Sequence, residues 1–116
     1  MKIIKYPQIP PKKFDSEEMK GITGRVVIGK NEGAKNFCMR LFEVEPGGNS
    51  PKHIHDWEHE IFIHSGNGEV YSNGSWHTVS TNDAIFIPAS EEHQIRNKAQ
   101  EKLVFLCLIP AKAPEI

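Results

Sequence analysis

Turn-forming residues interrupt this chain at short intervals, and that spacing constrains the fold more than any other feature. No segment carries a sustained 3.6-residue apolar period, so we expect little helix. Short apolar runs of strand length lie between the turns. Asn73-Gly74 predicts a two-residue hairpin turn, because both of its residues accept a positive φ. We therefore expect an all-β sandwich or barrel, with strands at 21–29, 36–45, 52–55, 59–65, 69–71, 75–79, 84–87, 94–97 and 103–109.

The 116 residues are enough for one domain with a core of its own. Residues 1–20 are expected to form an irregular arm, because Pro7, Pro10 and Pro11 are incompatible with a helix. Residues 21–110 would form the β domain, and 111–116 a short tail that Pro114 keeps irregular.

Composition argues against nucleic-acid and membrane partners. The formal net charge is −1 and the lysines are dispersed, so no long-range field attracts nucleic acid or an anionic membrane. The longest apolar run, 103–109, is too short to span a bilayer, and the N-terminus lacks the apolar core of a signal peptide. We expect a soluble, cytoplasmic protein. Cys38 and Cys107 lie in apolar strand-like runs, which favours two buried thiols over a disulfide.

Four histidines stand out by their spacing. His53, His55 and His59 fall within seven residues, and His93 follows in another short strand-like segment. Alternate residues of a strand point to one face, so His53 and His55 would present two imidazoles side by side. Imidazoles gathered in this way are typical ligands of a divalent transition metal. The alternative, histidines scattered over the surface, would not predict an i, i+2 pair with a third close behind.

Two motifs at matching spacing resemble those of the cupin superfamily. The first is a glycine, five residues, His-x-His, three or four residues, a glutamate, six residues and a glycine. Gly47, His53, His55 and Gly66 fit it, and His59 occupies the glutamate position. The second motif is a glycine, five residues, Pro-x-Gly, two residues, a histidine, three residues and an asparagine. The chain has its proline, histidine and asparagine, but other residues stand at the two glycine positions. Asn82 is a mild replacement because asparagine tolerates the left-handed conformation; the matching positions are Asn82, Pro88, Ser90, His93 and Asn97.

The resemblance implies a double-stranded β-helix, or jelly roll, that holds one metal in the mouth of the barrel. The chain looks like the four-histidine subclass of single-domain cupins, with His53, His55, His59 and His93 as ligands. Glu60 is the rival fourth ligand, but the spacing to Gly66 fits only His59, and strand alternation turns Glu60 away if His59 points inward. Small cupins of this kind are associated with Mn(II) or Fe(II), whereas the affinity order of divalent metals favours Cu or Zn, and Ni also suits imidazole.

Three further residues are candidates for a catalytic pocket. Arg40 lies mid-strand among apolar residues, where a substrate carboxylate, a structural ion pair or exposure of its head group would each accommodate the charge. Phe105 and Cys107 share one face of the last strand, which family geometry places across the barrel; Cys107 as a core filler is the alternative. The Trp57 side chain would either line the mouth of the barrel or pack against its own loop. His64 and His77 lack motif partners and are expected to be ordinary strand histidines.

Four imidazoles would leave two coordination positions for a chelating substrate, or for a substrate with dioxygen. The subclass is associated with O2-dependent carbon–carbon cleavage, so a dioxygenase acting on a small oxygenated or unsaturated molecule is the leading hypothesis. An isomerase or epimerase would need a general base that the sequence does not clearly supply. A non-catalytic module that binds a small ligand or metal is the other alternative. Similar cupins form homodimers that exchange N-terminal segments, and the apolar arm suits that role.

Overall fold

The computed structural model describes residues 1–116 and contains nine β-strands. The helical content is two three-residue 3-10 turns, η1 (Tyr6–Gln8) and η2 (Lys30–Glu32), so the all-β prediction is confirmed. The strands are β1 (Lys12–Phe14), β2 (Lys20–Ile28), β3 (Phe37–Asn49), β4 (His59–Ser65), β5 (Asn67–Ser72), β6 (Ser75–Ser80), β7 (Ala84–Ile87), β8 (His93–Arg96) and β9 (Leu103–Pro110).

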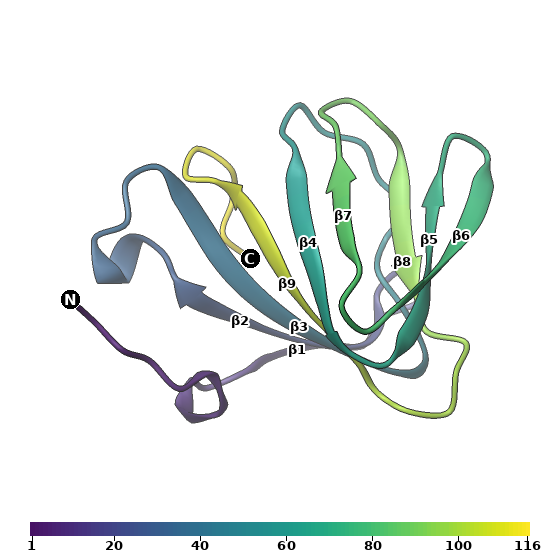
Figure 1. The fold of residues 1–116 in the computed structure, drawn as a ribbon, viewed down its shortest axis with the longest axis horizontal. Coiled ribbons are helices and arrows are strands. Elements are labelled where there is room, and N and C mark those ends of the chain that lie inside the picture. Colours follow the sequence, from purple (N-terminus) through teal and green to yellow (C-terminus); the bar gives the residue numbers. More distant parts are fainter.

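The strands form one curled sheet whose two halves face each other (Figure 1). One half contains β1, β2, β3, β9, β4 and β7, and the other contains β8, β5 and β6. The link between the halves is short: β3 and β8 pair at Asn49 and Arg96, and a few backbone hydrogen bonds on either side extend this contact. Strands β5 and β6 form the expected hairpin, in which Asn73 has a φ of 50° and Gly74 a φ of 83°. This arrangement encloses a narrow interior between the halves.

Strand alternation explains what fills this interior. The inward positions of β4 and β9 carry apolar side chains, and Ile63 and Leu103 have no exposed surface. The outward positions of β4 are exposed; they are Glu60, Phe62 and His64. Two-residue periodicity therefore assigns most core residues correctly. Cys38 and Cys107 are both buried free thiols, as predicted.

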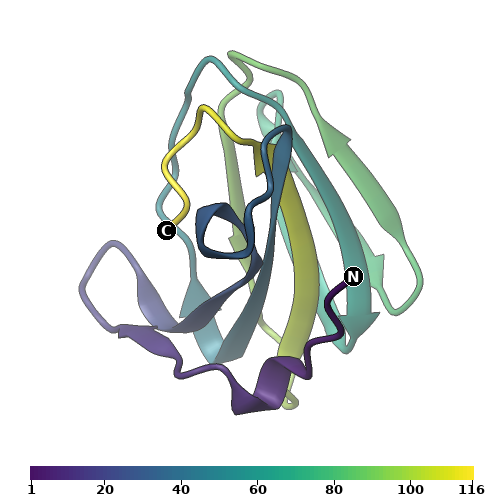
Figure 2. The ribbon, with the colours of Figure 1, turned by 90° about the vertical axis from the view of Figure 1, so that its left-hand side faces the viewer.

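The N-terminal arm lies on the outside of its own barrel (Figure 2). It is more regular than expected, because β1 pairs with β2, with Phe14 opposite Ile22. Three apolar residues of the arm pack on a small outer cluster of Val27, Leu41 and Val104; they are Ile4, Tyr6 and Ile9. The Arg25 Nε–H donates to the Ile9 carbonyl at 3.0 Å. The arm contains no α-helix, as its prolines require, but it does contain the 3-10 turn η1 and the short edge strand β1.

One predicted strand is absent, and another extends well beyond its predicted end. Residues 52–55 are not a strand; they belong to a loop in which only His53 forms an isolated bridge, to His93. Strand β3 does not end before Pro46 but continues to Asn49, with a register shift against β2. Gly47, with a φ of 83°, supplies the left-handed residue that this irregularity requires. No helix in the structure is long and apolar enough to cross a membrane.

Candidate metal centre

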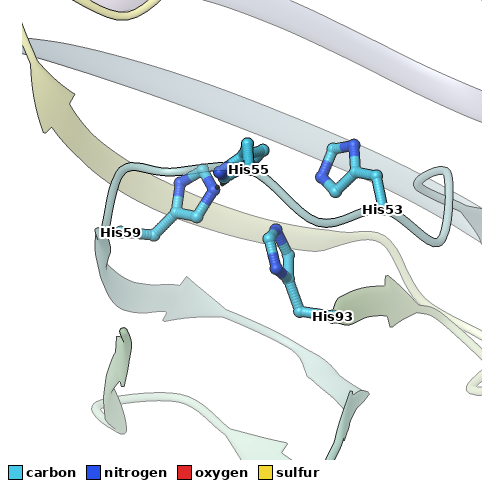
Figure 3. A group of neighbouring side chains, drawn as sticks. All are labelled: His53, His55, His59 and His93. Carbon is cyan, nitrogen blue, oxygen red and sulfur yellow. Dashed lines mark hydrogen bonds between the residues drawn. The ribbon is translucent and has the colours of Figure 1, made fainter. Parts of the chain in front are cut away.

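The four histidines converge at one end of the barrel interior, with their rings turned toward one another (Figure 3). His53 and His55 come from the loop before β4, and His59 and His93 are the first residues of β4 and β8. One ring nitrogen from each histidine lies within 4.8 Å of the corresponding atoms of the other three. His59 and His93 are 7% exposed, whereas His53 lies at the open edge.

Backbone bonds between the two motifs hold these segments together. The N–H of His53 donates to the carbonyl of His93, and the N–H of His93 donates back, at 3.1 and 3.0 Å. The N–H of Ser90 donates to the carbonyl of His55 at 2.7 Å. Ser90 reaches it with a φ of 64°, and Asn82 has a φ of 77°, so both adopt the left-handed conformation at the positions of the motif glycines.

Hydrogen bonds at Nδ1 orient the rings. The Nδ1–H of His93 donates to the Glu91 carbonyl at 2.8 Å, and that of His55 donates to the Trp57 carbonyl at 3.2 Å. In a neutral imidazole this arrangement leaves the Nε2 lone pair free to bind a metal. His59 differs, because its Nδ1 lies 3.2 Å from the Cys107 Sγ and 3.5 Å from an Arg40 nitrogen. The indole of Trp57 stacks on His55, with ring centroids 4.0 Å apart and an interplanar angle of 7°.

The site favours neutral imidazoles. Burial, with the neighbouring His93 and the Arg40 charge, lowers the pKa of His59 from 6.5 to about 3. Burial, with the adjacent His93 and His55, lowers the pKa of His53 to about 4, and the pKa of His55 is also lowered, chiefly by burial. Neutral rings at physiological pH are the form that binds metal.

The donor set fits a divalent transition metal. The Nε2 of His93 is buried and has no hydrogen-bond partner, so an ion at the centre of the cluster would satisfy it. The Nε2 atoms of His55 and His59 lie 3.0 Å apart. Two nitrogens bound at right angles about 2.1 Å from one ion would be about 3.0 Å apart. The chain therefore has a histidine cluster compatible with metal binding.

A cavity of about 130 Å³ adjoins the cluster and extends into the barrel. Arg40, Phe105 and Cys107, the candidates from the sequence, all lie on its wall, together with His53, His59 and His93. The Arg40 Nη2 lies 3.0 Å from the Cys107 Sγ. Burial raises the pKa of the Cys107 thiol, although the nearby Arg40 opposes that change. Phe105 packs against Phe42, with ring centroids 5.6 Å apart.

The remaining candidates lie elsewhere. Glu60 is exposed on the outer face and is not part of the histidine cluster. His64 and His77 are exposed residues of β4 and β6 and are not part of the histidine cluster. Sequence reasoning missed Met19 and Gln94, which also line the cavity. Met19 precedes β2 in the segment taken as an arm, and nothing in its local pattern indicates that the chain there turns into the barrel mouth.

A small β-barrel with a histidine cluster compatible with metal binding, beside a cavity that extends into the barrel, defines the class to which this protein belongs. The sequence matches the cupin domain family over residues 40–109, and the chain belongs to that family. The match includes both motifs and Arg40.

Named relatives of this chain differ in what they do. It is 32% identical over 101 residues to 1-methylthio-D-xylulose 5-phosphate methylsulfurylase of Rhodospirillum rubrum, a match that covers 87% of this chain but 64% of that protein. It is 28% identical over 113 residues to an oxalate-binding protein of Thermotoga maritima, with 92% of each chain covered. The structure superposes on the polyketide cyclase RemF of Streptomyces resistomycificus with a TM-score of 0.91 and 31% identity, over 98% of this chain and 82% of the other.

Proposed function

We propose that this protein is a metal-dependent enzyme in which His53, His55, His59 and His93 hold one divalent ion, Mn(II) or Fe(II) in the native state. The observation that carries the proposal is the convergence of four imidazoles beside a cavity in the barrel, where the buried Nε2 of His93 has no hydrogen-bond partner. A structural metal site would be closed off, whereas this one borders space for a guest molecule.

The bound metal would supply Lewis-acid activation of a substrate oxygen and, as Fe or Mn, electron transfer with dioxygen. The chain's own residues set the conditions for that chemistry. Trp57 stacks on His55 and restricts its ring, while Cys107 and Arg40 flank the Nδ1 of His59. The apolar wall around Phe105 limits the access of water to the substrate.

A dioxygenase is the reaction type that we favour. None of the residues lining the cavity is an aspartate or glutamate, so an isomerase or epimerase would lack the usual carboxylate base. A dioxygenase that cleaves a carbon–carbon bond places both oxygen atoms of O2 in its product and takes all four electrons from the substrate, so it needs no external reductant. The substrate would be a small oxygenated or unsaturated molecule, held close to the cluster by the narrow cavity.

A redox-neutral reaction is the second candidate. It is favoured by the names of two relatives that are 31% and 32% identical, a cyclase and a methylsulfurylase. Simple ligand capture is the third, favoured by the similarity to an oxalate-binding protein over nearly the whole length of both chains.

Oxygen consumption separates these candidates. Protein loaded with Fe(II) or Mn(II) would be mixed with a panel of diketones, catechols and styrenes, in air and under argon. A dioxygenase consumes O2 in proportion to product, and His59→Ala abolishes the reaction while His64→Ala, on the outer face of the same strand, does not. Turnover that persists under argon would replace the dioxygenase with the redox-neutral enzyme, and binding without turnover would indicate the capture module.

A further inference from the structure

One positive charge on the cavity wall has no counter-ion, although it lies over the face of the Phe42 ring, 5.0 Å from the ring centroid. Arg40 is the only lysine or arginine on this wall, and the wall has no acidic residue. The other two arginines of the chain are paired, Arg25 with Glu43 and Arg96 with Glu69 at 2.8 Å. Arg40 is in none of the four ion pairs of the structure. Burying a charge without a counter-ion costs folding free energy, so Arg40 destabilises the ligand-free fold.

The present neighbours of Arg40 leave it able to bind a ligand. Its Nη2 is 3.0 Å from the Cys107 Sγ and 3.5 Å from the His59 Nδ1, and its Nη1 is 3.5 Å from the Glu115 carbonyl. These are neutral groups, and the two distances of 3.5 Å are at the limit of a hydrogen bond. The Nε is buried and has no partner. The edge of the guanidinium formed by Nε and a neighbouring Nη is the edge that grips a carboxylate with two parallel bonds.

The C-terminal tail closes the side of Arg40 that lies away from the cavity. From the end of β9 the chain turns back over β2 (Figure 2), where two glycines make room for it. A Cβ at Gly24 would lie 2.6 Å from the Ile116 Cδ1, and one at Gly29 would collide with the Glu115 carboxylate. That carboxylate accepts the Lys30 N–H at 2.8 Å and does not pair with Arg40. An anion would therefore reach Arg40 from the cavity.

The rest of the wall selects for an apolar body. Beside Arg40 and the histidines, the cavity is lined mainly by aliphatic and aromatic side chains such as Ile61, Val70 and Phe105. Resting on the proposed metal-dependent function, we propose that the substrate is a small carboxylate with an apolar body. Its carboxylate pairs with Arg40, and a second oxygen faces the histidine cluster. A neutral molecule of the same shape would leave the Arg40 charge unpaired and would bind more weakly.

Calorimetric titration with two small aromatic probes tests the inference on protein loaded with Mn(II). Salicylate offers a carboxylate, a hydroxyl and an aromatic ring, whereas catechol offers two hydroxyls on the same ring without the carboxylate. We expect Arg40→Gln to weaken salicylate binding at least tenfold and to change catechol binding less than threefold. Arg40→Lys keeps the charge but loses the two parallel N–H donors of the guanidinium, so its salicylate affinity should lie between those of wild type and Arg40→Gln. Arg25→Gln is the matched control: Arg25 lies on the outer face of the sheet under the N-terminal arm and away from the cavity, so both affinities should be unchanged.

Metal content and thermal melting of each variant show whether Arg40 acts on the ligand or only through His59. Equal losses for salicylate and catechol, or an unchanged salicylate affinity in Arg40→Gln, would overturn the carboxylate assignment. In either case the metal site would stand if His59→Ala still removed the metal. A wild-type protein that binds no metal would instead refute the proposed function. If Arg40→Gln does not fold, the Arg40→Lys comparison alone decides: salicylate affinity no weaker than wild type would overturn the assignment.

Discussion

Acid should destabilise the metal-free protein through His59, beginning well above the pH at which carboxylates titrate. The pKa of this ring falls from 6.5 in the unfolded chain to about 3 in the folded protein. Because the folded pKa is the lower one, the unfolded state binds the proton first, so this contribution to stability is complete above pH 6.5 and is lost as the pH falls toward 3. At pH 5, which is 1.5 units below the pKa of 6.5, protonation of this ring stabilises the unfolded chain by about 2 kcal/mol, at about 1.36 kcal/mol per unit.

Urea denaturation in the presence of a chelator measures this loss between pH 7.5 and pH 5. Wild type should lose about 2 kcal/mol of unfolding free energy through His59. His53, whose pKa falls to about 4, adds a smaller loss because its ring lies at the open edge and is screened by solvent. His59→Gln should remove most of the pH dependence, and His64→Gln, on the exposed face of β4, should retain it. A wild-type stability that is flat over this range, or a His59→Gln variant as pH-dependent as wild type, would refute the reasoning.

Three further outcomes follow from the same structure. Metal at a hundredfold excess over its Kd should raise the unfolding free energy by about 2.7 kcal/mol, and His93→Gln should abolish this gain in a thermal melt. Ile63→Ala, at a position with no exposed surface, should cost about 2–5 kcal/mol in urea, whereas Phe62→Ala, 43% exposed, should cost less than about 1 kcal/mol. We also propose a homodimer that uses the N-terminal arm: deletion of residues 1–14 should weaken it, and a truncated chain still wholly dimeric by light scattering would contradict the proposal.

The parts of the fold that sequence could predict are those set by local chemistry. Two-residue alternation placed Phe105 and Cys107 on one face of β9, and the family resemblance turned that face inward. With His59 pointing inward, the same alternation placed Glu60 on the outer face of β4. Turn chemistry located the hairpin at Asn73-Gly74. The position of the C-terminal tail was not predictable in this way. It is held by contacts such as that of Glu115 with the Lys30 N–H, 85 residues earlier in the chain, and no local pattern encodes a contact at that separation.

The convergence of the histidines was predicted from a premise that the structure contradicts. Strand alternation was the reason for placing His53 and His55 on one face, yet both lie in a loop. What aligns them is pairing between distant segments: the reciprocal bonds of His53 with His93, and the Ser90 N–H on the His55 carbonyl. Motif spacing carries this information because it fixes where the second segment must bend, here at Ser90 in the left-handed conformation. The spacing of the two motifs was therefore a better guide to the site than the secondary structure inferred from either one.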